Sequence, residues 1–120
     1  MTWSDIKYFT PDEFKCKCGC GLLNIDMGLV KKLDRIRGVM QSPMAINSAC
    51  RCIAHNQKVG GLPDSAHLTG KAVDIGIEGS VYRFLFLRLA FTMFRRIKIY
   101  KTFVHVDVDE TKPSPVCAVG

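Results

Sequence analysis

Three residues of types that bind metal ions occur in two short segments of the sequence. The chain has three histidines, and two of them, His67 and His105, lie in "SAHLTGKAVDI" and "TFVHVDVD". Asp74 follows His67 by seven residues, and Gly70 between them permits the close backbone approach that a returning chain needs. A catalytic zinc ion takes about three histidine or carboxylate ligands and keeps one position open. Two imidazoles and one carboxylate would leave positive charge on the ion, which could polarise water and a scissile carbonyl group.

A simpler interpretation of these residues remains open at this point. A histidine in a loop and an aspartate in the next strand more often form a capped turn or a surface ion pair than a metal site. A single histidine on a strand, such as His105, is more often exposed or hydrogen-bonded. Spacing alone therefore does not establish the site.

The surrounding sequence predicts the elements that would position these residues. Thr10 and Asp26 are expected N-caps of the first two helices. We expect helices at 10–14, 25–40 and 80–94, strands at 43–49, 71–77, 96–100 and 102–108, a loop or short helix at 52–59 and a loop at 60–70. Because these elements alternate without a regular βαβ repeat, the sequence predicts an α+β fold with a small, mainly antiparallel sheet flanked by helices.

The strand expected at 102–108 has two different faces. Side chains alternate along a strand, so Phe103, His105 and Asp107 share one face, whereas the valines between them share the other. The valine face is expected in the core. His105 and Asp107 then face either a site or solvent.

Size, composition and charge limit the classes of protein. We expect one globular domain over residues 1–120, with a loosely ordered tail at about 111–120, and a monomer. The net charge of +6 favours anionic partners, but no charge run or aromatic stripe indicates nucleic acid, and none is expected. The start lacks the pattern of a secretory signal, and the most apolar segment carries Arg83 and Arg88, so neither export by a signal peptide nor a membrane span is expected.

Several short motifs follow one another in a specific order along the chain. They are S-x-x-R, H-N, V-G-G, S-x-H-x-x-G-x-A-x-D-I and F-V-H-V-D, carried by Ser48, Arg51, His55, Asn56, Gly60, Gly61, Ser65, His67, Gly70, Ala72, Asp74, His105 and Asp107. This order resembles the zinc peptidases that cleave bacterial cell-wall peptides. That family includes D-Ala-D-Ala carboxypeptidases and phage L-alanyl-D-glutamate endopeptidases, and it shares its fold with the hedgehog signalling domain. The segment "YFTPDEFKCKCGCG" also resembles the start of small phage-type members.

The resemblance implies roles for individual residues. It implies zinc ligation by His67, Asp74 and His105. Arg51 resembles the family's active-site arginine, which would hold a substrate carboxylate or the developing oxyanion, although a structural ion pair is the alternative. Ser65 and His55 would line the substrate pocket.

Ser65 and His55 also have structural alternatives. Ser65 could instead cap the loop, and His55 could pack within the helix before the Gly-Gly turn.

The general base departs from the family pattern. Other branches place an acidic residue three positions, or a second histidine two positions, before the second zinc histidine. Here those positions hold Thr102 and Phe103, which cannot accept a proton. Asp107 is the nearest replacement and is the predicted catalytic base; alternatively it orients a ligand imidazole.

Five cysteines form two groups, Cys16, Cys18 and Cys20 in the first and Cys50 and Cys52 in the second, and the resemblance implies that these groups fold near each other. Free buried thiols, a disulfide formed after release from the cell and a structural zinc ion are the three alternatives.

Together these observations predict zinc-dependent hydrolysis of an amide bond in peptidoglycan stem peptides. The resemblance favours a phage lysis enzyme or a virion-associated peptidase, made in the cytoplasm without a signal peptide and acting on the cell wall after release. The alternative is a non-catalytic zinc module, basic and cysteine-rich, that binds cell wall, nucleic acid or a protein.

Overall fold

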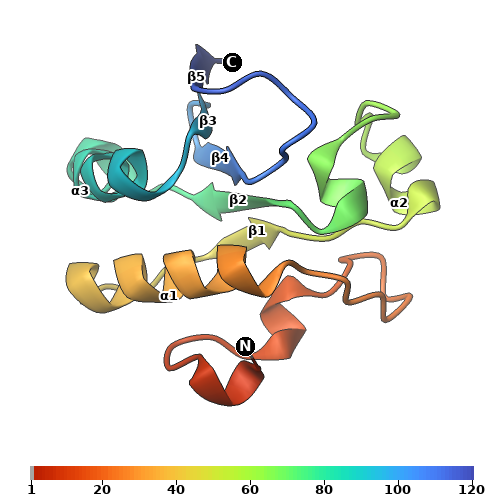
Figure 1. Cartoon of the computed structure of the whole chain (residues 1–120), viewed down its shortest axis with the longest axis horizontal. Coiled ribbons are helices and arrows are strands. Elements are labelled where there is room, and N and C mark those ends of the chain that lie inside the picture. Colours follow the sequence, from red (N-terminus) through yellow and green to blue (C-terminus); the bar gives the residue numbers. More distant parts are fainter. Residues whose placement is uncertain (1) are drawn as a thin grey trace.

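A five-stranded sheet runs through the middle of the structure, with strand order β1-β2-β4-β3-β5 (Figure 1). The structure is a computed structural model, which describes residues 2–120. The strands are β1 (Ile46–Ser48), β2 (Ala72–Gly76), β3 (Arg96–Ile99), β4 (Phe103–Asp107) and β5 (Val116–Val119). All neighbouring pairs are antiparallel except β3 and β5, which are parallel.

The α-helices of the described residues are α1 (Met27–Met40), α2 (Ile53–Lys58) and α3 (Gly79–Met93). Short 3₁₀-helices form η1 (Trp3–Asp5), η2 (Pro11–Phe14) and η3 (Ala66–Thr69). α2 and η3 lie beside each other near the start of β2, whereas α3 follows its other end (Figure 1). The predicted α+β fold, with a mainly antiparallel sheet flanked by helices, is confirmed. Within residues 2–120, no helix has both the length and the apolar character that a bilayer span requires.

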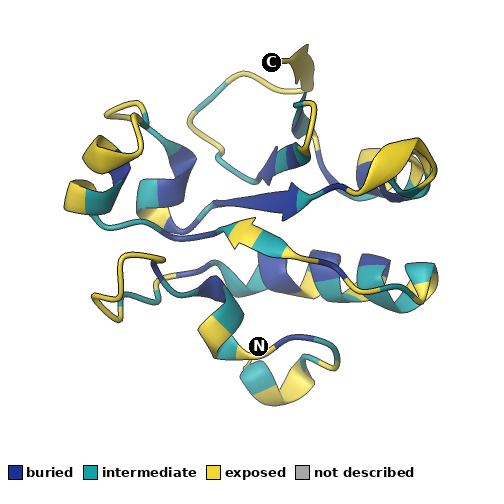
Figure 2. Ribbon diagram, turned by 180° about the vertical axis from the view of Figure 1, so that it is seen from behind, coloured by how far each residue is buried: buried dark blue, intermediate teal, exposed yellow. Residues whose placement is uncertain are grey.

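One face of the sheet packs on α1 and α3. Val104 and Val106 of β4 are fully buried and belong to one apolar core with Leu33 of α1 and Phe86 of α3. β2 is buried along nearly its whole length (Figure 2). The predicted division of β4 into a core face and a second face is thus confirmed, because His105 lies on the side opposite the valines.

α1 begins where the sequence predicts. The side chain of Asp26 accepts a hydrogen bond from the backbone N–H of Leu29 at 3.0 Å, which caps the helix. The same carboxylate accepts from Lys71 Nζ at 2.8 Å, and the backbone N–H of Asp26 donates to the Gly70 carbonyl at 2.9 Å. The start of α1 is therefore fastened to the turn that precedes β2.

Gly70 is required at this turn. Its φ of +70° lies in the left-handed region, and a Cβ at this position would lie 1.8 Å from the carbonyl oxygen of Asn24. A glycine here lets the chain turn back toward β2 directly after η3.

The C-terminal segment corrects one expectation. Residues 111–120 were predicted to be a loosely ordered tail, but Val116–Val119 form β5 along the free edge of β3. The backbone N–H of Val116 donates to the Arg95 carbonyl, and that of Gly120 donates to the Ile99 carbonyl. All four β5 residues are exposed, so the strand is held by its backbone hydrogen bonds. Its sequence therefore lacks the alternation of buried and exposed residues from which a strand is predicted.

Candidate metal centre

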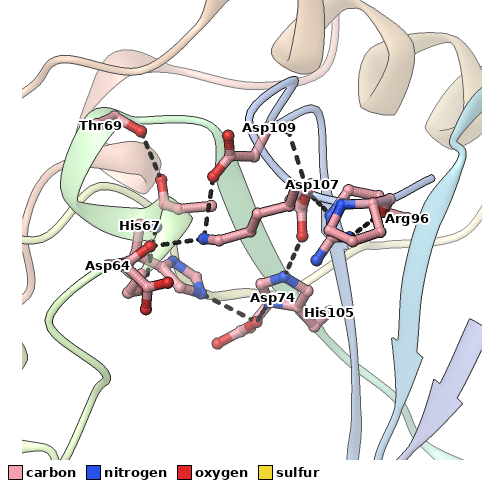
Figure 3. A network of polar contacts seen from close by, with 12 residues as sticks. Asp64, His67, Thr69, Asp74, Arg96, His105, Asp107 and Asp109 are labelled. Atoms are coloured by element: carbon pink, nitrogen blue, oxygen red, sulfur yellow. Dashed lines mark hydrogen bonds and ion pairs between the residues drawn. The ribbon is translucent and has the colours of Figure 1, made fainter. Parts of the chain in front are cut away.

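The pairing of β2 with β4 forms one half of the site. The register places Asp74 opposite His105 and Ala72 opposite Asp107, on the face that points away from the core. His67 comes from η3, where the Ser65 side chain accepts from the His67 N–H. Figure 3 shows both imidazoles directed at Asp74.

The predicted ligand atoms converge. Asp74 Oδ1 lies 3.3 Å from His67 Nε2 and 3.0 Å from His105 Nδ1, and the three ligand atoms all lie within 4.8 Å of one another. His67 is 3% exposed and Asp74 7% exposed. The structure therefore brings together the three residues that the sequence analysis selected as a metal-binding set.

The second nitrogen of each imidazole shows that this donor set fits a cation. His67 Nδ1 lies 2.6 Å from the Ala49 carbonyl oxygen, which can only accept, so this nitrogen carries the proton. His105 Nε2 lies 2.8 Å from Asp107 Oδ2, which fixes its proton in the same way. Both remaining nitrogens then direct lone pairs at the Asp74 carboxylate. Two lone pairs and a carboxylate that face one another need a cation or shared protons between them.

The close contacts among these side chains shift the pKa values of Asp74 and His105. Burial alone would raise the pKa of Asp74. Where the imidazoles share protons with the carboxylate, hydrogen bonds from His105 and His67 hold this pKa well below its usual range. Burial alone would lower the pKa of His105, but Asp107 and Asp74 raise it above its ordinary value. Both shifts describe a site that attracts positive charge.

Arg51 lies beside the metal-binding set and is held from two sides. Its Nε donates to Ser48 Oγ at 3.1 Å, and one terminal nitrogen donates to Asn56 Oδ1 at 3.2 Å. The other terminal nitrogen lies 3.5 Å from Asp74 Oδ2. Asn56 is itself 2% exposed and donates to the Leu62 carbonyl, which fixes its orientation. Sequence reasoning found Arg51 but gave no role to Asn56, although it is part of the H-N motif.

Asp107 lies behind His105 as seen from Asp74. Its Oδ1 accepts from Arg96 Nε at 2.7 Å and from the backbone N–H of Asp109 at 3.1 Å, while Oδ2 faces His105 (Figure 3). Burial raises its pKa, but hydrogen bonds from His105 and Asp109 lower it below the usual range. Both carboxylate oxygens are occupied and the residue is 3% exposed. These contacts favour the orienting role for Asp107 over that of a base.

Arg96 was not found from the sequence. It lies opposite Asp107 across β3 and β4, and no local motif marks it. Only the strand register places it there.

A cavity of about 480 Å³ opens over the site. Its lining includes the three candidate ligands and Arg51, together with the basic side chains of Lys98 and Lys112. Ser65 lines the cavity as predicted, but His55, on α2, is not among its lining residues. Phe103 stacks on the ring of Tyr100 and gives the cavity an apolar wall.

The cysteines of the two sequence groups meet only in part. The sulfur atoms of Cys16, Cys18, Cys20 and Cys52 lie within 4.8 Å of one another, as the resemblance implied for these segments. Cys50 is buried and donates to the carbonyls of Phe14 and Leu22. It is therefore turned away from the other four thiols.

A protein-family model matches most of the chain. The family model described as Peptidase M15 matches residues 7–107, which include every residue of the metal-binding set, Arg51 and Asp107. No curated protein matches the chain. The resemblance seen in the motifs is thereby confirmed over most of the sequence, and the chain belongs to the peptidase M15 family.

Proposed function

We propose that this chain is a zinc-dependent peptidase that hydrolyses an amide bond in peptidoglycan stem peptides. Family membership supports a metallopeptidase. The observation that carries the proposal is the arrangement of the two imidazoles. Each is hydrogen-bonded through its far nitrogen and presents its other nitrogen to Asp74.

His67 Nε2, His105 Nδ1 and a carboxylate oxygen of Asp74 would hold the zinc ion. Bound there, zinc would supply Lewis-acid activation of a water molecule and of the scissile carbonyl. The Ala49 carbonyl and Asp107 keep both histidines in the tautomer that can ligate.

Arg51 positions the substrate or stabilises charge that develops on it. Its guanidinium stays protonated at all relevant pH, and Ser48 and Asn56 fix its plane. A preorganised donor of this kind stabilises an oxyanion without reorganisation during the reaction. Lys98, which lines the same cavity, matches the free carboxylates of stem peptides, whereas the ammonium group of Lys112 is paired with Asp109.

Asp107 is not our candidate for the base that accepts a proton from water, because its two carboxylate oxygens are hydrogen-bonded to Arg96 and His105. Asp64 is the other carboxylate that lines the cavity besides Asp74 and Asp107 within the described part of the chain. We assign proton acceptance to Asp64.

A phage lysis or virion-associated role is our proposal for the biological setting. It rests on the resemblance of residues 8–21 to small phage-type members of the family. In that setting the enzyme would reach the cell wall after release, and its net charge of +6 would retain it on an anionic wall.

Digestion of purified peptidoglycan tests the proposal. We expect zinc-loaded protein to release fragments whose new termini, identified by mass spectrometry, define the bond that is cut. A chelator should stop the release, added zinc should restore it, and His67→Ala should remove it. His55→Gln changes a histidine outside the cavity lining and should retain cleavage.

Cleavage that continues unchanged with the chelator would contradict the metal assignment. Binding to the wall without new termini would instead support the non-catalytic zinc module.

A further inference from the structure

A second group of metal-ligating side chains lies apart from the candidate metal centre. It consists of the thiols of Cys16, Cys18, Cys20 and Cys52, here called the four-sulfur cluster. Cys16 Sγ lies 3.5 Å from Cys18 Sγ, and Cys18 Sγ lies 3.7 Å from Cys52 Sγ. All six cysteines of the chain are free in the structure.

The two sulfur–sulfur distances given above are close to those of a tetrahedral zinc site. Zinc–sulfur bonds of about 2.3 Å place the corners of a ZnS₄ tetrahedron about 3.8 Å apart. The two sulfur–sulfur distances of the four-sulfur cluster are close to this edge length. All four sulfurs lie within 4.8 Å of one another, whereas a disulfide would engage only two of them.

The backbone of residues 16–22 is shaped to gather the first three sulfurs. The backbone N–H of Cys16 donates to the Leu22 carbonyl at 2.9 Å, which closes the loop. Gly19 and Gly21 adopt φ values of +87° and +84°, and a Cβ on either would meet no atom within 4 Å. Steric space therefore does not require these glycines. The positive φ values do, because glycine adopts them without strain in the turn over residues 17–20 and directly after it.

Backbone donors point at two of the sulfurs. Cys16 Sγ accepts from the backbone N–H of Cys52 at 3.4 Å, and Cys52 Sγ accepts from that of His55 at 3.3 Å. These contacts fix the positions of both sulfurs within the cluster. The other two cysteines are different. Cys50 donates its own proton to carbonyl groups, and Cys117 is exposed on β5.

We propose that Cys16, Cys18, Cys20 and Cys52 bind a structural zinc ion, separate from the ion at the His67, Asp74 and His105 centre. The ion fastens the loop at 16–20 to the residue that follows Arg51 in the chain. It thereby stiffens the segment that carries the arginine at the cavity. Cys50, which the sequence analysis grouped with these cysteines, is not a ligand.

Metal analysis under reducing conditions tests the proposal. Wild-type protein is loaded with zinc, freed of excess metal and measured for zinc per chain by mass spectrometry. We expect about two zinc ions in the wild type, one in Cys20→Ser, one in His67→Ala and none in the double variant. Cys117→Ser, a cysteine change outside the cluster, should keep both. Cys18→Ser serves as a second cluster variant, and circular dichroism confirms that each variant is folded.

Spectroscopy assigns the ligands independently of enzyme activity. His67→Ala protein loaded with Co²⁺ should show thiolate-to-cobalt charge-transfer absorption, and adding Cys20→Ser should remove it. The same His67→Ala protein should melt at a higher temperature with zinc than with chelator, because the metal binds only the folded cluster.

Three results would overturn the inference. The first is that Cys20→Ser and Cys18→Ser retain the full zinc content of the wild type. The second is a count of fewer than six free thiols in unfolded, metal-free protein, which indicates a disulfide. The third is six free thiols with no metal bound in His67→Ala. If the peptidase proposal alone is wrong, the protein does not cleave peptidoglycan but still shows the thiolate-to-cobalt absorption.

Discussion

Replacing Asp107 with asparagine separates its two candidate roles. Asp107 Oδ1 receives two donors, Arg96 Nε at 2.7 Å and the Asp109 N–H at 3.1 Å, so the amide oxygen of an asparagine would stay on that side. Its NH₂ group would then face His105 Nε2, which in the wild-type protein donates to Asp107 Oδ2. The imidazole would have to accept there and carry its proton on Nδ1, the nitrogen that faces Asp74.

This change of tautomer gives the expected magnitude. A proton on His105 Nδ1 must leave before the nitrogen can bind zinc. Loss of an outer partner of a ligand histidine typically lowers metal affinity about 10–100-fold. That corresponds to about 1.4–2.7 kcal/mol of binding free energy. We therefore expect zinc to bind Asp107→Asn about 10–100 times more weakly than the wild type.

Competition with a chromogenic chelator measures this affinity. The titration is made in the Cys20→Ser background, so that the four-sulfur cluster does not contribute. Asp109→Asn is the matched control, because the Asp109 side chain contacts Thr111 and Lys112 and only its backbone contacts Asp107. Its zinc affinity should equal that of the parent. If Asp107→Asn binds zinc as tightly as the parent but loses turnover, the orienting role is refuted and Asp107 is the base.

Two further predictions concern stability, measured by urea unfolding. Gly70→Ala should lower the free energy of unfolding by about 3 kcal/mol or more, because left-handed backbone strain adds to a clash with the Asn24 carbonyl. Gly60→Ala is the control: Gly60 has a φ of +76° with no neighbour within 4 Å of its Cβ position, so this change should cost only about 1–2 kcal/mol. Equal losses of stability in the two variants would contradict the close approach of Gly70 to Asn24. Asp26→Ala should cost about 1 kcal/mol at pH 7 through the lost cap, and Asp26→Asn less, since asparagine also caps. Burial raises the pKa of Asp26, but Lys71 and the Leu29 N–H lower it below its usual value. The stability that the ionised carboxylate contributes is therefore complete above the unfolded pKa and is lost as the pH falls through the folded pKa. A difference between wild type and Asp26→Asn that grows toward low pH would contradict this sign.

The sequence predicted helices and strands correctly where the spacing of apolar residues and the local capping residues indicate the same element. α1 has a capping aspartate and apolar residues at helical spacing, and Leu29, Leu33 and Ile36 are almost fully buried as that spacing requires. The alternation in β4 placed His105 opposite the core for the same reason.

The parts that were missed depend on partners distant in the chain. β5 is held by backbone hydrogen bonds to the edge of β3, and its exposed side chains carry no pattern. The contact of Arg96 with Asp107 follows from strand register. Asn56 supports Arg51 because α2 lies against the loop that contains Leu62, which spacing along the chain does not show.

The alignment of β2 with β4 has a consequence for how the protein matures. Asp74 and His105 are 31 residues apart and become neighbours only when the two strands pair in their native register. A slip by one residue would turn the imidazole into the apolar interior and put a valine in its place. A newly made chain with formed helices but misaligned strands would thus have no tight affinity for the ion at this centre. Zinc bound at this centre would therefore stabilise the sheet in its native register over forms with misaligned strands.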